Sequence, residues 1–193
     1  KTADNKTEQI GFSIGKDTND KSPTFGKNIL FRSEEGGYSW RPMETPGCDN
    51  VSQVAMFDDT SVVIVCNDNE IKFSSDRGNT FKKIDVPMPT GKEIFYSQFM
   101  VSNNYIIFTA GNHQLYYGYL ENGNLIIKEA TLFDSDNREY GVNNNGQIFS
   151  ITTKGIYRSQ IDKSKTNLDW IQISPKDLFG LSYVFKVFDK NSI

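Results

Sequence analysis

The sequence predicts an all-β fold, a small β-propeller with four blades. Short runs rich in Val, Ile, Thr, Phe and Tyr alternate with turns rich in Asn, Asp and Gly, which is typical of strands joined by hairpins. Signals that begin and end helices are scarce. The pattern also recurs, because strands ending at Ser33, Ser74, Gly118 and Ser159 are 41, 44 and 41 residues apart. Repeats of about 40–45 residues with four strands each are typical of propeller blades.

Each repeat contains strands a, b, c and d, and three a–b turns are evident. They are Asp58–Thr60, Asn103–Asn104 and Asn143–Gly146. Each turn precedes an apolar run, such as Ser61–Cys66 or Tyr105–Thr109, which we interpret as part of strand b. The predicted strands of the second, third and fourth blades are Val51–Phe57, Ser61–Asn67, Ile71–Ser74, Thr80–Val86, Phe95–Val101, Tyr105–Ala110, Gln114–Tyr119, Asn124–Ala130, Glu139–Asn143, Gln147–Thr152, Gly155–Ile161 and Asp169–Ser174.

The two ends of the chain complement each other. The N-terminal part supplies Glu8–Ile14, Lys27–Ser33 and Tyr38–Pro42, which match strands b, c and d, and the C-terminal part supplies Leu181–Phe188, which matches strand a. We therefore expect one domain, closed by a composite blade, since closure removes exposed strand edges. Its blades are residues 8–42 with 181–193, 51–86, 94–130 and 139–174. The alternative is a fragment of a larger propeller, cut at a blade boundary.

Two c–d turns share a pattern of polar residues. Residues Ser74–Phe81 match S-x-D-x-G-x-T followed by an aromatic residue, and Ser33–Trp40 match it with Glu35 and Ser39 in place of Asp and Thr. The carboxylate can accept hydrogen bonds from turn amides, and the glycine can adopt a positive φ. The pattern resembles the Asp-box (BNR) repeat of sialidase-like β-propellers. The corresponding turns of the third and fourth blades depart from it.

This resemblance implies a structural role for the box residues. They are Ser33, Glu35, Gly37, Trp40, Ser74, Asp76, Gly78, Thr80 and Phe81. The closing aromatic residues, Trp40 and Phe81, are expected to pack into their blades. The alternative is calcium or ligand binding by Asp76 and Glu35. Because the boxes of similar propellers are structural, we predict no metal site and no cofactor.

The resemblance extends to sialidases, but the residues argue against catalysis. The sialidases that this pattern resembles have larger propellers. In them, several arginines hold the substrate carboxylate beside catalytic Tyr, Glu and Asp residues. Here Arg32 and Arg158 occupy equivalent strand-c positions, which indicates a role in the repeat. The only histidine, His113, cannot form a two-histidine metal site. No catalytic residue can be assigned, and we expect a protein that is not an enzyme.

The composition argues against two further kinds of partner. The chain has 21 Lys and Arg against 24 Asp and Glu, a formal net charge of −3, which does not favour a nucleic acid. Because no apolar run approaches the roughly 18 residues that a membrane-spanning helix needs, we expect no membrane insertion.

The b–c and d–a loops are expected to lie at one end of each blade, with the Asp boxes at the other. The longest of these loops, residues 16–26, is polar and ends in an apolar Phe25 and a glycine. Loops held by a rigid scaffold commonly carry function, so we expect a partner to bind here. The candidate contact residues are Phe25, Asp68, His113, Asp134, Asp136 and Arg138. The alternatives are disorder for residues 16–26, a solvent-facing loop histidine for His113 and a solvated turn for Asp134–Arg138.

The two cysteines belong to one predicted blade. Cys48 comes just before strand a and Cys66 ends strand b, so both thiols should lie at the same end of neighbouring strands. A disulfide there would close a loop of about 19 residues and stabilise the fold by about 3 kcal/mol. It would indicate a periplasmic or secreted protein. The alternative is a buried free Cys66 and an exposed Cys48.

These features predict a non-enzymatic module that binds another protein through loops at one end. The expected role is inhibition or neutralisation of a secreted toxin, a hydrolase or an envelope protein, in the manner of an immunity protein. A glycan-binding propeller is the alternative, although Trp40 and Trp170 are expected to pack inward and not to stack on sugars. A third alternative is an enzyme whose catalytic residues are not recognisable from the sequence.

Overall fold

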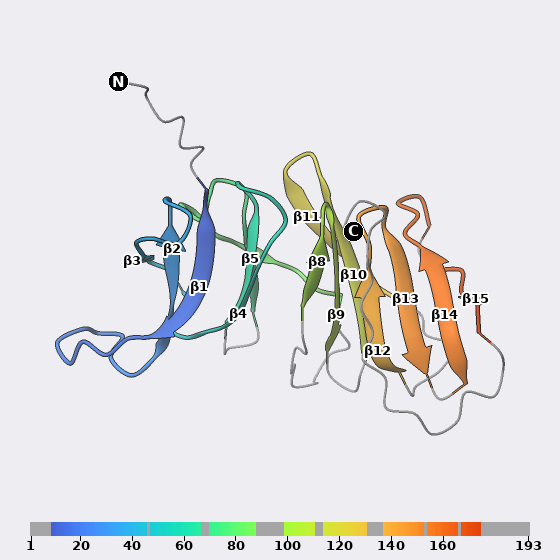
Figure 1. Ribbon diagram of the computed structural model, residues 1–193, viewed down its shortest axis with the longest axis horizontal. Coiled ribbons are helices and arrows are strands. Elements are labelled where there is room, and N and C mark those ends of the chain that lie inside the picture. Colours follow the sequence, from blue (N-terminus) through green and yellow to red (C-terminus); the bar gives the residue numbers. More distant parts are fainter. Residues whose placement is uncertain are drawn as a thin grey trace. The chain divides into compact units, whose positions relative to one another are not determined.

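Antiparallel hairpins make up the regular structure of the computed structural model (Figure 1). It describes residues 9–45, 47–66, 70–87, 99–110, 114–130, 137–152, 154–165 and 167–174, without the side chains of residues 137 and 138. Across these ranges it contains fifteen strands in four sheets and no helix. The chain divides into two compact units, Lys1–Ile84 (unit 1) and Asp85–Ile193 (unit 2), and each is described by itself.

Unit 1 holds two sheets. Their strands are β1 (Gly11–Lys16), β2 (Asn28–Ser33), β3 (Arg41–Pro42), β4 (Val51–Met56), β5 (Val62–Cys66), β6 (Ile71–Ser74) and β7 (Lys82–Ile84). The first sheet has the order β1-β2-β3 and the second β4-β5-β6-β7, so each strand pairs with the next along the chain. The two sheets contact each other where β4 packs against β1 and β2.

Unit 2 repeats this plan with two four-stranded sheets. Their strands are β8 (Met100–Ser102), β9 (Tyr105–Ala110), β10 (Gln114–Glu121), β11 (Asn124–Glu129), β12 (Asn137–Val142), β13 (Gln147–Thr152), β14 (Gly155–Gln160) and β15 (Ile171–Gln172). In both sheets the order of the strands follows the chain, and β12 packs against β8 and β9. The prediction of an all-β chain built from successive hairpins is confirmed.

The predicted closing strand, Leu181–Phe188, lies outside the described residues. Within the described part of the chain, β1 pairs with β2 alone, so the first sheet has three strands where the other three have four. The composite blade and the single closed domain therefore remain predictions.

The predicted starts of the last strands were wrong. We expected them at Tyr38, Thr80 and Asp169, whereas β3, β7 and β15 begin two or three residues later. In the two Asp-box turns, side-chain oxygens accept hydrogen bonds from backbone amides, and residues with a positive φ reverse the chain. The strand ladder therefore begins only after the turn.

The core of unit 1 lies between its two sheets. Its buried residues are Leu30, Cys48, Val51, Val62, Ile64 and Cys66, and Phe12, Ile14, Met43, Val54, Met56 and Phe81 pack against them. Every residue of β5 is buried, as the run of apolar residues predicted. Since side chains alternate along a strand, Leu30 points into this core while Ile29 and Phe31 lie on the opposite face of the first sheet.

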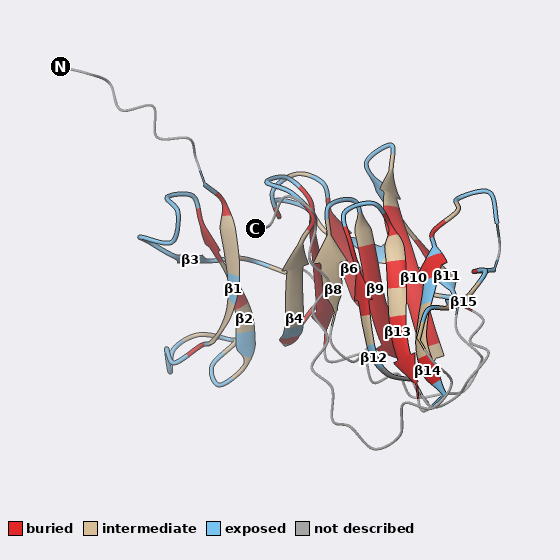
Figure 2. Cartoon of the chain, turned by 45° about the vertical axis from the view of Figure 1, so that its right-hand side comes forward, coloured by how far each residue is buried: buried red, intermediate tan, exposed pale blue. Residues whose placement is uncertain are grey.

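The core of unit 2 is formed in the same way and is rich in tyrosine. Its buried residues are Ile107, Leu115, Tyr117, Tyr119, Ala130, Val142, Ile148, Ile161 and Leu168. Figure 2 shows buried residues along β9 and β10, which are middle strands of their sheet. Trp170 is partly buried against this cluster, as we expected from its position in predicted strand d.

The two sheets of unit 1 also interlock at their Asp-box end. Arg32 is buried, and its guanidinium donates hydrogen bonds to the Arg77 carbonyl (2.6 Å) and to Asn79 Oδ1 (2.9 Å) in the turn of the other sheet. The ring of Phe12 lies against Gly78 in the same turn. Arg32 therefore holds the structure together, as its place in the repeat suggested, whereas the equivalent Arg158 is exposed.

Replacing Gly78 by Ala is expected to lower the free energy of unfolding more than replacing Gly123. Both glycines have a positive φ, +77° and +73°, so either alanine costs about 1 kcal/mol of backbone strain. An added Cβ at Gly78 would lie 2.9 Å from the Phe12 ring, whereas at Gly123 no atom of the described residues lies within 4 Å. Crowding should therefore cost the Gly78 variant a further 1–3 kcal/mol or so. Equal losses in urea-induced unfolding would contradict the packing that we describe.

Candidate functional site

The second Asp-box turn is held by its own polar side chains. Ser74 Oγ accepts hydrogen bonds from the amides of Asp76 (3.2 Å) and Gly78 (2.9 Å). Asp76 accepts from the Thr80 amide at Oδ1 (2.9 Å) and from the Thr80 hydroxyl at Oδ2 (2.6 Å). Burial raises the pKa of Asp76, but the hydrogen bonds from Thr80 and Ser74 and from the turn amides outweigh it and hold the pKa below its ordinary value.

The first Asp-box turn repeats this arrangement with Glu and Ser. Ser33 Oγ accepts from the amides of Glu35 (3.3 Å) and Gly37 (2.8 Å), and Ser39 donates to Glu35 Oε2 (2.8 Å). The carboxylates of both turns thus bind hydroxyls of their own turn. Among the described residues, no group of three His, Cys, Asp or Glu is placed to hold a metal ion. The structural role of the boxes, as opposed to ligand binding, stays a prediction.

Trp40 does not pack inward as we expected. Its side chain lies against Gly11 and Gly37, and Nε1 donates to the Gly37 carbonyl (3.0 Å), yet the residue is 44% exposed. It lies against Gly11 of β1, and among the described strands β1 pairs with β2 alone. Phe81, the equivalent residue of the second turn, is half-buried against the core of unit 1.

The Cys48–Cys66 disulfide is present, as predicted. The sulfurs are 2.07 Å apart and the Cα atoms 5.4 Å apart. The bond fastens the β3–β4 loop, residues 43–50, to the end of β5. Nearby, the buried Lys72 donates from Nζ to the Gly47 carbonyl (2.5 Å), which gives the same loop a second attachment. This loop is therefore tied to the second sheet at the end opposite the Asp boxes.

The β1–β2 loop, residues 17–27, is ordered around one carboxylate. Asp17 Oδ1 accepts from the Asn19 amide (2.9 Å), and Oδ2 accepts from the Thr24 hydroxyl (2.6 Å). The backbone closes the loop through Asp17 N to the Lys27 carbonyl (2.9 Å) and Gly26 N to the Asp17 carbonyl (2.8 Å). Gly26 has a φ of +79°, which favours glycine at this point. The loop is thus a folded projection and not an irregular tether.

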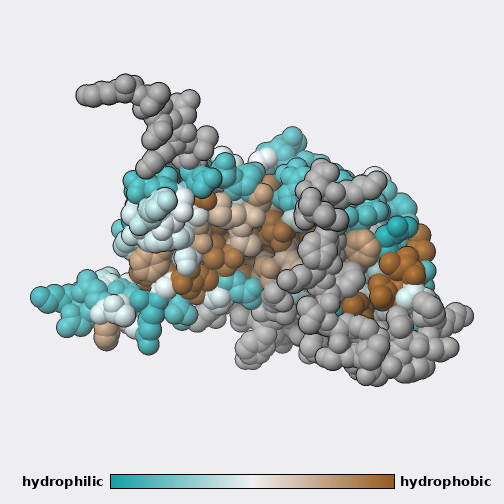
Figure 3. Space-filling view, in the orientation of Figure 1, coloured by the Kyte–Doolittle hydropathy of each residue, from teal (hydrophilic) through white to brown (hydrophobic). Residues whose placement is uncertain are grey.

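The two loops meet at one end of unit 1. Asn28 N donates to Asn50 Oδ1 (2.7 Å), and Lys27 Nζ lies 3.4 Å from Asp49 Oδ2. This contact confirms for unit 1 that a b–c loop and a d–a loop share one end. Figure 3 shows the projecting β1–β2 loop as a mostly hydrophilic surface at the lower left of the view, with hydrophobic surface beside it.

A groove with a volume of about 750 Å³ lies between these loops and the outer face of the first sheet. Its lining residues are Asp17, Asn19, Ser22, Pro23, Thr24, Ile29, Phe31, Pro42, Met43, Glu44, Thr45, Cys48 and Asp49. Its size falls within the usual range for ligand pockets, roughly 300–1,000 Å³, and it combines apolar strand residues with polar loop residues. We refer to it as the loop-end groove.

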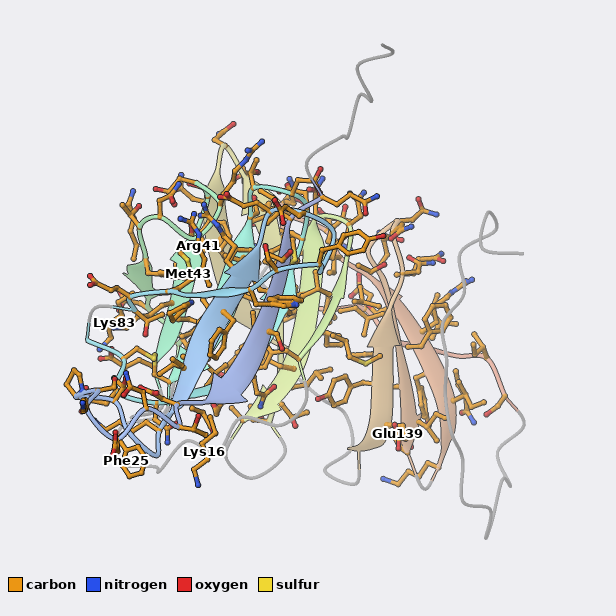
Figure 4. The ribbon with its side chains drawn as sticks, turned by 60° about the vertical axis from the view of Figure 1, so that its left-hand side comes forward. Lys16, Phe25, Arg41, Met43, Lys83 and Glu139 are labelled. Atoms are coloured by element: carbon orange, nitrogen blue, oxygen red, sulfur yellow. A yellow bond between two sulfur atoms is a disulfide. The ribbon has the colours of Figure 1, made fainter. Side chains whose placement is uncertain are left out.

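Phe25 is carried by the loop that forms one wall of the groove. The residue is 56% exposed, and its amide donates to the Ser22 carbonyl (3.1 Å), so an ordered backbone presents an apolar ring to solvent. Figure 4 shows Phe25 on this loop at the lower end of the unit, with Lys16 pointing away below it. Among the predicted contact residues, Phe25 is the one whose side chain the structure describes.

The remaining predicted contact residues are not placed. Asp68, His113, Asp134 and Asp136 lie outside the described residues, as does the side chain of Arg138. Sequence reasoning in turn missed the groove-lining residues Asp17, Glu44 and Asp49 and the strand residues below them. The strand residues carried a usable signal, because Ile29 and Phe31 alternate with the core residue Leu30.

A search of the described residues found no helix with the length and apolar character needed to cross a membrane.

Comparison with known proteins gives the fold and no family. No protein-family model matches the chain, and no curated protein matches it. Among solved structures, the Niastella koreensis GH74 enzyme matches with a TM-score of 0.52 and 17% identity, over 86% of this chain and 28% of that one. This likeness supports a β-propeller fold, and at such identity it supports the fold alone.

Two YCF48 structures match less closely. YCF48 from Cyanidioschyzon merolae has a TM-score of 0.47 and 12% identity, over 75% of this chain and 52% of that one. YCF48 bound to D1 peptide has a TM-score of 0.44 and 13% identity, over 75% and 48%. The chain thus spans about half the length, or less, of the solved structures that it matches.

Acidification is expected to loosen the β1–β2 loop. Hydrogen bonds from the hydroxyl of Ser22, then from Thr24 and from the Asn19 amide, hold the pKa of Asp17 below its ordinary value. The stabilisation is therefore complete above about pH 4 and is lost as the pH falls through the lowered pKa. Protection factors of the amides of residues 24–27, obtained by NMR as the exchange rate relative to the intrinsic rate at the same pH, measure this loss between neutral and acidic pH.

Asp17→Asn should make the protection factors of these amides nearly independent of pH. The exposed Asp20 has no hydrogen-bond or ion-pair partner among the described residues, so Asp20→Asn serves as the matched control and should retain the pH dependence of the native loop. Identical pH profiles for the two variants would show that Asp17 does not order the loop.

Proposed function

We propose that this protein is a non-enzymatic β-propeller module that binds another protein through the loop end of unit 1. The observation that carries the proposal is the exposed Phe25 on a hydrogen-bonded loop beside the loop-end groove. Exposed aromatic residues next to pockets are frequent anchors in protein interfaces. Since the solved structure of YCF48 with D1 peptide matches at a TM-score of only 0.44, it adds no argument, and the proposal rests on this chain's own residues.

The fixed geometry of the two loops favours tight binding. Association costs free energy when flexible loops must become ordered, and a loop that is already folded avoids much of this cost. The Asp17 hydrogen bonds order one loop, while the disulfide and Lys72 order the other. The partner would therefore meet a surface that is formed before it arrives.

The role that we propose is inhibition or neutralisation of a toxin, a hydrolase or an envelope protein outside the cytoplasm. The disulfide supports this location, because such bonds form and persist in the periplasm and in secreted proteins. A rigid surface that blocks a partner needs no chemistry of its own, so the proposal requires no catalytic residue.

Phe25→Ala should weaken binding of the partner by about 2 kcal/mol, or about thirtyfold in Kd. Proteins retained from a secreted or periplasmic fraction by the immobilised chain would be identified, purified and titrated by calorimetry against both forms. Ile171 in unit 2 is 57% exposed, close to the 56% of Phe25, so Ile171→Ala is a matched control that should leave Kd unchanged. The proposal fails if no captured protein loses affinity through Phe25→Ala while the variant keeps the native thermal stability.

Glycan binding is the second candidate, and the exposure of Trp40 favours it. The indole is held by its hydrogen bond to the Gly37 carbonyl, Trp40 is 44% exposed, and the neighbouring Tyr38 is 91% exposed. A fixed aromatic face of this kind can stack on the apolar face of a sugar ring. This site lies at the Asp-box end of unit 1, opposite the loop-end groove.

Titration with soluble oligosaccharides should quench tryptophan fluorescence if Trp40 forms a sugar site. Trp40→Ala should abolish that quench, whereas Phe25→Ala should preserve it because Phe25 lies at the other end of the unit. A glycan array without binding, or binding that survives Trp40→Ala, would exclude the glycan-binding alternative.

A further inference from the structure

We infer that the loop-end groove accepts an extended protein segment that carries an apolar side chain next to a Lys or Arg. The inference deepens the proposed function and rests on it, because it specifies the chemistry of the partner that binds at this end of unit 1. It is argued from the floor of the groove, from the charges of its rim and from its size.

The floor of the groove is apolar and is built by strands. Ile29 and Phe31 stand on the outer face of β2, and Pro42 of β3 lies opposite Phe31 in the ladder. Ile29 and Phe31 are only half-buried, so each retains apolar surface that a partner can remove from water. Burying such surface is favourable by about 25 cal/mol per Å², which gives the floor a preference for an aliphatic side chain.

The charged residues that line the groove are all acidic. They are Asp17, Glu44 and Asp49, and no Lys or Arg is among its lining residues. The Asp17 carboxylate is occupied by the hydrogen bonds of its own loop. Glu44 is exposed and has no hydrogen-bond or ion-pair partner among the described residues. Glu44 is therefore the lining carboxylate that is most available to a cation.

Asp49 adds to the negative charge on the same wall. Among the described residues its ion-pair partner is Lys27, at 3.4 Å, and the Asp49 side chain is 92% exposed, so this surface ion pair is weak and exchangeable. In Figure 4 the side chain of Lys16 is directed downward from the ribbon, and Lys16 is not among the residues that line the groove. A groove with walls of low dielectric focuses the field of the charges that line it, and because these are carboxylates we expect the groove to attract cations.

The size of the groove and the chemistry of its rim together favour a peptide. A volume of about 750 Å³ accommodates a few residues of extended chain. The same carboxylates repel phosphate and acidic side chains, which disfavours nucleic acids and acidic segments. A basic and apolar segment matches the floor and the rim at once.

Two capped hexapeptides test this inference, Ala-Leu-Lys-Leu-Lys-Ala and the same peptide with Glu in place of Lys. Each is titrated into the full-length, disulfide-bonded protein while amide shifts are followed by NMR. The Lys peptide should shift the amides of Ile29, Phe31, Glu44 and Asp49, and the Glu peptide should bind at least about tenfold more weakly. Binding of the Lys peptide should weaken as salt shortens the Debye length from about 10 Å at 0.1 M to about 3 Å at 1 M.

Charge reversal within the groove provides the sharper test. Glu44→Lys should weaken the Lys peptide by about threefold to tenfold and strengthen the Glu peptide. Asp59 is an exposed carboxylate in the β4–β5 turn, at the Asp-box end of the same unit, so Asp59→Lys has the same change in net charge and should alter neither affinity. Equal binding of the two peptides, or equal effects of the two variants, would overturn the inference.

The other occupants of the groove give distinct results. If groove amides shift on concentrating the protein alone, a second copy occupies the groove, and if they shift when residues 175–193 are removed, the chain's own tail does. Either result overturns the inference. If the peptide test fails but a protein partner is found whose affinity depends on Phe25, only the proposed chemistry of the groove is refuted. If a peptide binds in a charge-dependent manner but no protein partner depends on Phe25 for its affinity, the proposed function is refuted.

Discussion

The packing of one sheet against the next fixes the surfaces of unit 1. At the Asp-box end, Arg32 and Phe12 of the first sheet engage the turn of the second sheet around Gly78. At the other end, the Cys48–Cys66 disulfide ties the intervening loop to β5. Because the sheets are held at both ends, the loops between them cannot move independently of the core. The shape of the groove is thus a consequence of how the sheets pack.

Much of the fold could be predicted because each hairpin carries its own local signals. The a–b turns are marked by Asp and Asn, and Asp58 accepts hydrogen bonds from the amides of Thr60 and Ser61. The disulfide followed from the alternation of strand direction, which brings the end of β5 beside the start of β4. The starts of the last strands were misjudged, because a residue such as Thr80 satisfies its amide on a side chain and does not join the ladder.

The candidate site was harder to predict because its residues come from separate parts of the chain. Phe25 could be proposed from the polar loop around it, but the groove needs Glu44 and Asp49 from another loop, and that proximity depends on sheet packing. Trp40 was misjudged for a related reason: an aromatic residue beside a strand is buried only if something covers that face. Local sequence patterns indicate which residues form a turn or a strand. They do not indicate which other element of the chain packs over that strand.

The covalent link beside the groove has a practical consequence for purification and assay. Both sulfurs are almost fully buried, yet the bond anchors a groove wall whose other residues are largely solvent-exposed. If a thiol reductant opens it, the wall loses its covalent anchor, whereas the backbone ladders of the hairpins do not include this bond. Oxidised and reduced preparations would then differ in how this wall is anchored, so the free-thiol content of each batch has to be measured alongside any binding assay.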